Sequence, residues 1–403
     1  MKNGSTALPP IEKVEIGSRS EIIVNGKPFI PIMSWLQHPE SEYSSYSYLR
    51  SLNFNTFMGT PRDITPLEQA EEAKKAGGYA VVCQHTPEQV AETAGHSHVL
   101  AWHHPDEPDM PTKIEEGVYE PRQNPKDIQK RYQFLRDNNI DRPVFVTFTA
   151  HFMKESQNRY SKEKKKEVYP PLISAADVVG FDVYPIYGWG RPCWLNHTAS
   201  GVKQLVQMAN GRPVYAWIET CKGSKWMPYE KQLDVLPIHT RYQVWSALIN
   251  GATAIGYFTH AWFPKFTSFA PTQDMQDELT RLNGQITRLT QAIVAPYSTR
   301  NIVVKMICDD GITSLLNRFM ATEYEGCLYL FIQNADLGAN VESLGQYDPI
   351  SPRGGSAKIE VEGLCKGTVI EVIDEEREIT ANEGFFIDEF APLCEHIYRI
   401  KMS

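Results

Sequence analysis

The chain has 403 residues, and its 49 acidic side chains outnumber the 40 basic ones, which gives a formal net charge of -9. This acidic balance disfavours nucleic acid as a partner, because binding to phosphates depends on lysine and arginine. No stretch approaches the roughly 20 apolar residues that a membrane span requires, so no membrane span is expected. The length predicts two domains.

Residues 1–27 predict an N-terminal tail and a β-hairpin. Two alternating runs, 11–16 and 21–24, precede Asn25-Gly26, a dipeptide typical of tight turns. The first six residues lack the hydrophobic core of a signal peptide. We therefore expect either a cytoplasmic protein or a secreted or periplasmic one whose signal has been removed. Seven cysteines without a Cys-x-x-Cys spacing disfavour a zinc cluster or a disulfide framework.

Residues 28–297 alternate between apolar, strand-like segments and amphipathic, helix-like segments. Eight such units predict an α/β fold, the (β/α)8 TIM barrel, with a parallel sheet covered by helices. A doubly wound open sheet is the main alternative, but no glycine-rich phosphate loop follows the first strand. The third and fifth helices are weakly marked. The strands are expected at 29–34, 56–59, 79–83, 99–103, 144–149, 178–184, 214–218 and 254–259.

The pattern changes after the last predicted helix. That helix carries one apolar face at helical spacing, from Leu279 to Ile293, and Pro296 ends it. Beyond it the apolar residues recur with a period of two, which predicts a C-terminal antiparallel β-sandwich over residues 298–403. Its strands are expected at 302–307, 327–332, 359–361, 369–373, 385–387 and 396–402.

Polar and aromatic side chains gather where the predicted barrel strands end. In a TIM barrel the carboxyl ends of the strands form the active site. Asp182 and Tyr184 follow the sixth strand and, by alternation, share a face. The candidates at these strand ends are Ser34, Trp35, Gln37, His38, Arg62, Gln84, His85, His103, His104, Asp106, Glu107, Asp182, Tyr184, Glu219, His260 and Trp262, and Trp189 lies in an aromatic loop after the sixth strand.

Two glutamates stand out in this set. Glu107 follows the fourth strand within Asp106-Glu107-Pro108, and Glu219 ends the seventh strand. If both strands belong to one barrel, both carboxylates lie at the same mouth, and cleavage of a glycosidic bond needs two carboxylates facing each other. A solvated turn around Glu107 and a salt bridge at Glu219 are the simpler structural explanations.

The arrangement resembles clan A glycoside hydrolases, which are retaining (β/α)8 enzymes. In that clan the acid/base glutamate follows strand four, commonly as Asn-Glu-Pro, and the nucleophile ends strand seven. The resemblance implies that Glu107 is the acid/base and Glu219 the nucleophile. It also implies that Tyr184 hydrogen-bonds the nucleophile and that Trp262 floors a sugar subsite. Asp106 replaces the usual asparagine, and an ionised aspartate can accept the hydrogen bond of a sugar hydroxyl but cannot donate one.

The mechanism implied is double displacement on a poly- or oligosaccharide. Glu219 would attack the anomeric carbon, while Glu107 would protonate the leaving oxygen and then activate water. Carbohydrate is the expected partner, no cofactor is expected, and the sequence leaves the oligomeric state open. The residues expected to contact the sugar are Trp35, Arg62, His104, Asp106, Asp182, Tyr184, Trp189, His260 and Trp262.

Two alternatives use the same barrel. The first is a metal-dependent hydrolase with His103, His104 and Asp106 as ligands, although no metal site is the main expectation. The second is a carbohydrate-binding barrel that keeps its aromatic residues and has lost turnover.

Overall fold

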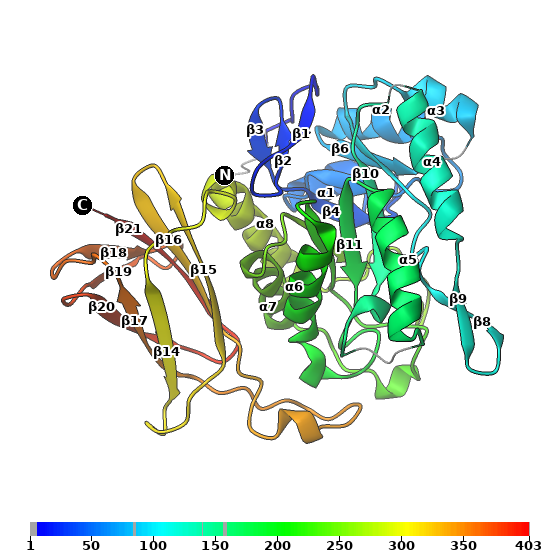
Figure 1. Ribbon diagram of the computed structural model, residues 1–403. Coiled ribbons are helices and arrows are strands. Elements are labelled where there is room, and N and C mark those ends of the chain that lie inside the picture. Colours follow the sequence, from blue (N-terminus) through cyan, green and yellow to red (C-terminus); the bar gives the residue numbers. More distant parts are fainter. Residues whose placement is uncertain (1–5, 84–85, 139, 156–158, 403) are drawn as a thin grey trace.

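The computed structural model describes residues 6–83, 86–138, 140–155 and 159–402 (Figure 1). It contains a small N-terminal sheet, a closed barrel of eight parallel strands surrounded by helices, and two antiparallel sheets at the C-terminus. The predicted TIM barrel with a C-terminal β-sandwich is therefore confirmed. Within the described ranges, no helix combines the length and apolar character needed to cross a membrane.

The N-terminal sheet has three strands, β1 (Val14–Ile16), β2 (Ile22–Val24) and β3 (Lys27–Phe29). The predicted turn lies between β2 and β3, where Asn25 and Gly26 adopt φ values of 52° and 75°. Two successive left-handed residues are the geometry that Asn-Gly favours. The sheet covers the amino-terminal end of the barrel, the upper end in Figure 1.

The barrel strands close in chain order, so that the last strand pairs with the first. Their bounds agree with the predicted ones to within a few residues. In order they are β4 (Ile32–Trp35), β5 (Thr56–Met58), β6 (Tyr79–Cys83), β7 (Val99–His103), β10 (Val144–Thr149), β11 (Val178–Asp182), β12 (Val214–Glu219) and β13 (Ala254–Phe258).

Helices surround the barrel, and local sequence explains their ends. Helix α2 begins with a capping box between Thr65 and Glu68, and Gly77 ends it in the left-handed conformation. The weakly marked third and fifth helices are α3 and α5. The bounds are α1 (Tyr46–Ser51), α2 (Pro66–Ala76), α3 (Pro87–Thr93), α4 (Pro125–Asp137), α5 (Lys162–Ser174), α6 (His197–Ala209), α7 (Pro237–Ile249) and α8 (Gln273–Ile293), with short 3-10 turns at η1 (Ala150–Phe152), η2 (Pro192–Trp194) and η3 (Tyr229–Lys231).

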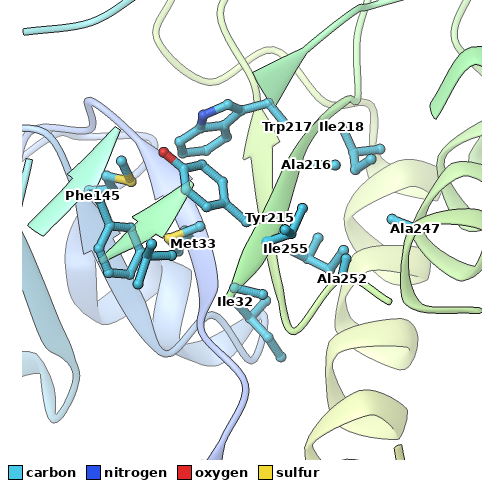
Figure 2. Close-up of a cluster of buried hydrophobic side chains, with 14 of the residues drawn as sticks. Ile32, Met33, Phe145, Tyr215, Ala216, Trp217, Ile218, Ala247, Ala252 and Ile255 are labelled. Carbon is cyan, nitrogen blue, oxygen red and sulfur yellow. The ribbon is translucent and has the colours of Figure 1, made fainter. Parts of the chain in front are cut away.

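Alternation along β12 separates the barrel interior from the helical layer (Figure 2). Tyr215 and Trp217 point into the barrel, whereas Ala216 and Ile218 face the opposite side. The two large rings fit because their neighbours are glycines. A Cβ built on Gly180 would lie 2.2 Å from the Tyr215 ring, and one on Gly256 would lie 2.3 Å from the Trp217 ring. The barrel is therefore filled by large side chains opposite small ones.

The C-terminal strands form a three-stranded sheet, β14-β17-β20, and a five-stranded sheet, β15-β16-β21-β18-β19. The sequence analysis did not predict two of these strands, β15 and β19. The inner faces of both sheets contribute to one apolar core. The bounds are β14 (Ile302–Cys308), β15 (Asn317–Tyr324), β16 (Cys327–Asn334), β17 (Gly355–Val361), β18 (Val369–Val372), β19 (Arg377–Thr380), β20 (Phe385–Phe390) and β21 (Glu395–Lys401), with a 3-10 turn at η4 (Val341–Ser343).

The five-stranded sheet also packs on the barrel helices. The ring of Phe331 on β16 stacks on Trp245 of α7 at a centroid distance of 5.8 Å. Thr322 Oγ1 on β15 donates a hydrogen bond of 2.6 Å to the carbonyl of Ala292 in α8. Arg318 donates to Ser246 Oγ at 2.7 Å. Strand β16 is therefore buried on both faces.

Candidate functional site

The carboxyl ends of the barrel strands meet at the end opposite the N-terminal sheet, the lower end in Figure 1. We call this end the mouth. A hairpin of β8 (Pro111–Glu115) and β9 (Val118–Pro121), which follows β7, projects beside it. A second long connection, residues 183–196, follows β11. The sequence analysis did not identify the hairpin.

Glu107 lies on the short loop between β7 and this hairpin. Its φ of 46° is left-handed, which is uncommon for a residue with a Cβ and costs about 1–3 kcal/mol where the surroundings enforce it. The side chain is 18% exposed and therefore reaches solvent. Arg122, which follows β9, lies 3.3 Å from Glu107 Oε2 and donates to the carbonyl of Asp106 at 3.2 Å. The hairpin thus places the positively charged Arg122 beside the carboxylate of Glu107, which precedes the hairpin in the chain.

Asp109 anchors the same loop from within the protein. It is fully buried and accepts hydrogen bonds from Thr149 N at 2.9 Å, from Thr149 Oγ1 at 2.7 Å and from the Tyr169 hydroxyl at 2.9 Å. Its own carbonyl accepts a bond of 2.6 Å from the Tyr160 hydroxyl. Burial raises the pKa of Asp109 to about 7. These bonds tie the Glu107 loop to β10 and α5.

Asp182, at the end of β11, brings a second carboxyl to Glu107. The two carboxyl groups lie close enough for a hydrogen bond between them. Two carboxyl groups form such a bond only when one of them is protonated. Burial and the negative charge of Glu107 raise the pKa of Asp182 well above its usual range, which favours a proton on the pair. The pair therefore holds an acidic proton at the mouth.

Glu219 is at the predicted strand end, but its carboxylate is fully buried. Oε2 accepts the backbone N–H groups of Ile186 at 3.0 Å and of Tyr187 at 2.7 Å, and Oε1 accepts from Gln243 Nε2 at 2.9 Å. The expected Tyr184 does not supply these donors; its ring packs on Phe258 at 4.9 Å. The structure therefore places Glu219 beneath the loop that follows β11.

The burial of Glu219 has a consequence for stability. Burial raises its pKa from 4.5 to about 7. The folded state therefore retains a proton that the unfolded state releases, and the stabilisation from this proton is complete below pH 4.5 and is lost as the pH rises through 7. We expect Glu219→Gln, which stays neutral, to gain about 2 to 3 kcal/mol relative to the parent between pH 5 and pH 8.

Urea unfolding at pH 5, 6.5 and 8 measures this gain. Glu116→Gln, on a side chain that is 97% exposed, is the matched control and should show no such trend. A stability difference between Glu219→Gln and the parent that is constant across the three pH values would contradict the expectation.

Aromatic rings form one side of the mouth. Trp262 stacks on Phe258 at 5.9 Å with an interplanar angle of 11°. Trp226, which is 53% exposed, lies 6.3 Å from Trp262 and 5.8 Å from Tyr187. Trp35 meets the edge of Trp217 at 5.3 Å deeper in the barrel. Exposed aromatic faces suit stacking on the apolar faces of sugars.

The remaining predicted residues divide between mouth and interior. His260 is buried against Phe258 and Trp262, and burial lowers its pKa to about 4, so it is neutral. Arg62 and Asp106 are exposed, and Trp189 is 45% exposed.

The expectation that His104 contacts the sugar is corrected: it is fully buried, and its Nε2 bonds the carbonyl of Ala175 at 2.7 Å. Gln84 and His85 lie outside the described residues.

The geometry does not support the metal alternative. His103 is buried within the barrel, with Nε2 3.1 Å from Thr147 Oγ1, while the neighbouring His104 bonds Ala175. Among the residues that the structure describes, no group of three or more His, Cys, Asp or Glu side chains could hold a metal ion.

Sequence reasoning missed three residues of the site. Arg122 contacts Glu107 only because the β8–β9 hairpin folds back, and the hairpin was not recognised. Asp109 was not singled out from its polar surroundings in the sequence, yet it is buried and bonded to Thr149 and Tyr169. Gln243 lies on α7, and its spacing alone gives no signal that it meets Glu219.

Comparison with known proteins adds evidence at the level of the fold. No family model and no curated sequence matches the chain. Among solved structures, the apo GH42 exo-carrageenase from Bacteroides ovatus has a TM-score of 0.57 at 9% identity, covering 99% of this chain and 86% of that one. A candidate glycoside hydrolase from Bacteroides vulgatus has a TM-score of 0.57 at 11% identity, covering 100% of this chain and 84% of that one.

The chain shares the fold of these glycoside hydrolases. The coverage includes both the barrel and the C-terminal β-sandwich, because almost the whole chain superposes. The resemblance to glycoside hydrolases that the sequence motifs indicate is thus confirmed for the fold. At sequence identities of 9% and 11%, the roles of individual residues in those enzymes cannot be assigned to this chain.

Proposed function

We propose that the protein is a glycoside hydrolase that cleaves a poly- or oligosaccharide, with Glu107 as general acid/base. The observation that carries the proposal is the solvent-reaching carboxyl of Glu107, which contacts Arg122 and lies beside Asp182 at the mouth of a barrel lined by Trp262 and Trp226. A positioned proton donor beside aromatic platforms is what glycosidic cleavage requires. The shared fold supports the same class of activity.

The proton needed for the first step is stored on the carboxyl pair. The raised pKa of Asp182 favours a proton on the pair, and the closeness of Asp182 to Glu107 would let the pair deliver that proton to the leaving oxygen as one titrating unit. Arg122, 3.3 Å from Glu107, stabilises the carboxylate that remains after the transfer. The same carboxylate can then activate water.

Glu219 stays the predicted nucleophile because of its place at the end of the seventh barrel strand. A nucleophile must be ionised and must reach the anomeric carbon, whereas this carboxylate is enclosed by the amides of Ile186 and Tyr187. Attack by Glu219 therefore requires these amides to move away from it. Asp182, beside Glu107, is the other carboxyl group at the mouth, and it could attack only in its ionised form.

Covalent trapping tests the proposal. The protein is first screened for release of reducing sugar from a panel of polysaccharides and aryl glycosides, and the anomer formed first is identified by NMR. A matching 2-deoxy-2-fluoroglycosyl fluoride is then used to label the nucleophile for peptide mapping. Retention with a label on Glu219 supports double displacement as predicted. A label on Asp182 reassigns the nucleophile, and inversion without a label replaces the mechanism by single displacement.

The enclosed Glu219 carboxylate favours one further candidate function, a carbohydrate-binding barrel without turnover. This candidate predicts saccharide binding by calorimetry with no hydrolysis of any member of the panel. The absence of both binding and hydrolysis over the whole panel would overturn the assignment to carbohydrate.

A further inference from the structure

One segment of the C-terminal domain leaves its own sheets and crosses to the barrel mouth. Residues 335–354, which connect β16 to β17, extend as an orange loop with the turn η4 below the sheets in Figure 1, toward the loop that follows β11. We call residues 335–354 the crossing segment. Such long connections in compact domains commonly have a function.

The tip of the crossing segment binds the loop after β11 through contacts of Gln346 and Tyr347. Tyr347 N donates a hydrogen bond of 2.6 Å to the carbonyl of Gly190, and Gln346 Nε2 donates one of 2.9 Å to the carbonyl of Trp189. The Tyr347 ring covers Gly190, where a Cβ would lie only 2.7 Å from the ring. Gly190 also has a left-handed φ of 60°, so glycine suits both its backbone and its contact.

The base of the crossing segment is fixed to the β-domain. Arg353 makes two hydrogen bonds to Asp336, from Nε at 2.9 Å and from Nη2 at 2.8 Å. Asp336 also accepts the N–H of Gly338 at 2.9 Å. Asn334 Nδ2 donates to the carbonyl of Arg353 at 2.7 Å. The two ends of the segment are thus fastened to each other, which gives the tip a stable base.

The loop after β11 is held from the opposite side by Glu219. Residues 184–190 form a helix-like turn in which Gly188 N donates to the carbonyl of Tyr184 at 2.8 Å and Gly190 N donates to that of Ile186 at 2.9 Å. The free amides at the start of this turn bind the Glu219 carboxylate, as amides at helix N-termini bind anions. Trp189, 45% exposed, lies between these two anchors.

We propose that the crossing segment is part of the sugar site and that Tyr347 and Gln346 are positioning residues for Trp189. The β-domain thereby supplies the outer support of a sugar-stacking platform whose inner support is Glu219. Exposed tryptophan rings stack on sugars. Such a ring contributes more to affinity when its orientation is fixed before the sugar binds, because less entropy is lost on binding. The identity of the ligand as a saccharide rests on the proposed function, whereas the positioning of Trp189 does not.

The first measurement needs no saccharide. Tryptophan fluorescence of the full-length protein is quenched with acrylamide in the parent and in Tyr347→Ala, Tyr347→Phe and Trp189→Ala, so that the Trp189 contribution is obtained by difference. We expect Tyr347→Ala to change the quenching of Trp189, and Tyr347→Phe, which keeps the ring and the backbone N–H, to restore the parental value. Unchanged quenching in Tyr347→Ala would overturn the proposal.

The second measurement uses a saccharide that the panel shows to be bound or cleaved. We expect Tyr347→Ala to raise Kd or KM by about 5- to 10-fold with little change in kcat, because a stacking contact is weakened while the carboxyl pair is untouched. In Trp189→Ala the additional Tyr347→Ala change should have no further effect. Equal, additive losses from the two changes would overturn the link between them.

Two further outcomes are distinguishable: an unstable variant, and a parent protein that binds no saccharide. Gly190→Ala disturbs the same contact from the barrel side, so it should reproduce the quenching change of Tyr347→Ala if either variant proves unstable. If no saccharide binds the parent protein, the proposed function fails, and the quenching experiment still decides whether the β-domain positions Trp189.

Discussion

Glu107→Gln is expected to lower kcat/KM by about 10²- to 10⁴-fold on substrates with poor leaving groups, the usual contribution of a positioned general acid. Glutamine has nearly the same shape and can still accept from Arg122, so the loop should keep its conformation. It cannot supply the proton that the pair with Asp182 delivers. The measurement is steady-state hydrolysis of an alkyl glycoside and of an activated aryl glycoside of the same sugar.

Comparing two leaving groups distinguishes the loss of the proton donor from a general disturbance of the fold. An activated aryl leaving group needs little protonation, so Glu107→Gln should affect that substrate far less than the alkyl glycoside. Glu116→Gln, at the turn of the adjacent β8–β9 hairpin and 97% exposed, is the control and should match the parent on both. An equal decrease of kcat/KM for the two substrates would contradict the assignment of Glu107 as the proton donor.

Asp109→Ala is expected to destabilise the protein by about 3–5 kcal/mol, the range seen when one partner of a buried polar network is removed. The change leaves the N–H and hydroxyl of Thr149 and the hydroxyl of Tyr169 without their buried acceptor. It also releases the loop that carries Glu107. Urea denaturation at pH 7 measures the free energy of unfolding.

Asp109→Asn provides the comparison. An amide keeps one acceptor oxygen and fits the same space, so it should cost clearly less than alanine. If Asp109→Ala lowers the free energy of unfolding by less than about 1 kcal/mol, the network around Asp109 does not stabilise the loop in the way inferred here.

The barrel could be predicted from sequence because the apolar runs of the strands and the start signals of the helices indicated the same alternation of strands and helices. The apolar strands are buried on both sides and therefore appear as continuous runs, such as 144–149 and 214–218. Proline at the first helical position and a capping residue mark α2, α3 and α4. Strand β15 was missed because its residues mix charged and apolar types, with one face against the helices of the barrel.

The site was harder to predict because strand position does not determine what a carboxylate contacts. Glu107 and Glu219 both follow the expected strands, yet one reaches solvent and the other binds backbone amides from a different loop. His103 and His104 are adjacent, and alternation sends the first into the barrel and the second toward Ala175. Such differences depend on loop conformations formed by residues far apart in sequence.

Strand β16 contributes side chains to the interiors of both domains. Its alternate side chains enter two different cores: Leu328 and Leu330 pack within the sandwich, whereas Tyr329 and Phe331 belong to the apolar cluster of the barrel. A cut near residue 297 would separate the chain at a convenient connection and still divide a continuous interior. The chain thus has two architectures that share one packed interface, so an exchange of the sandwich for another domain would have to preserve the helical surface on which it rests.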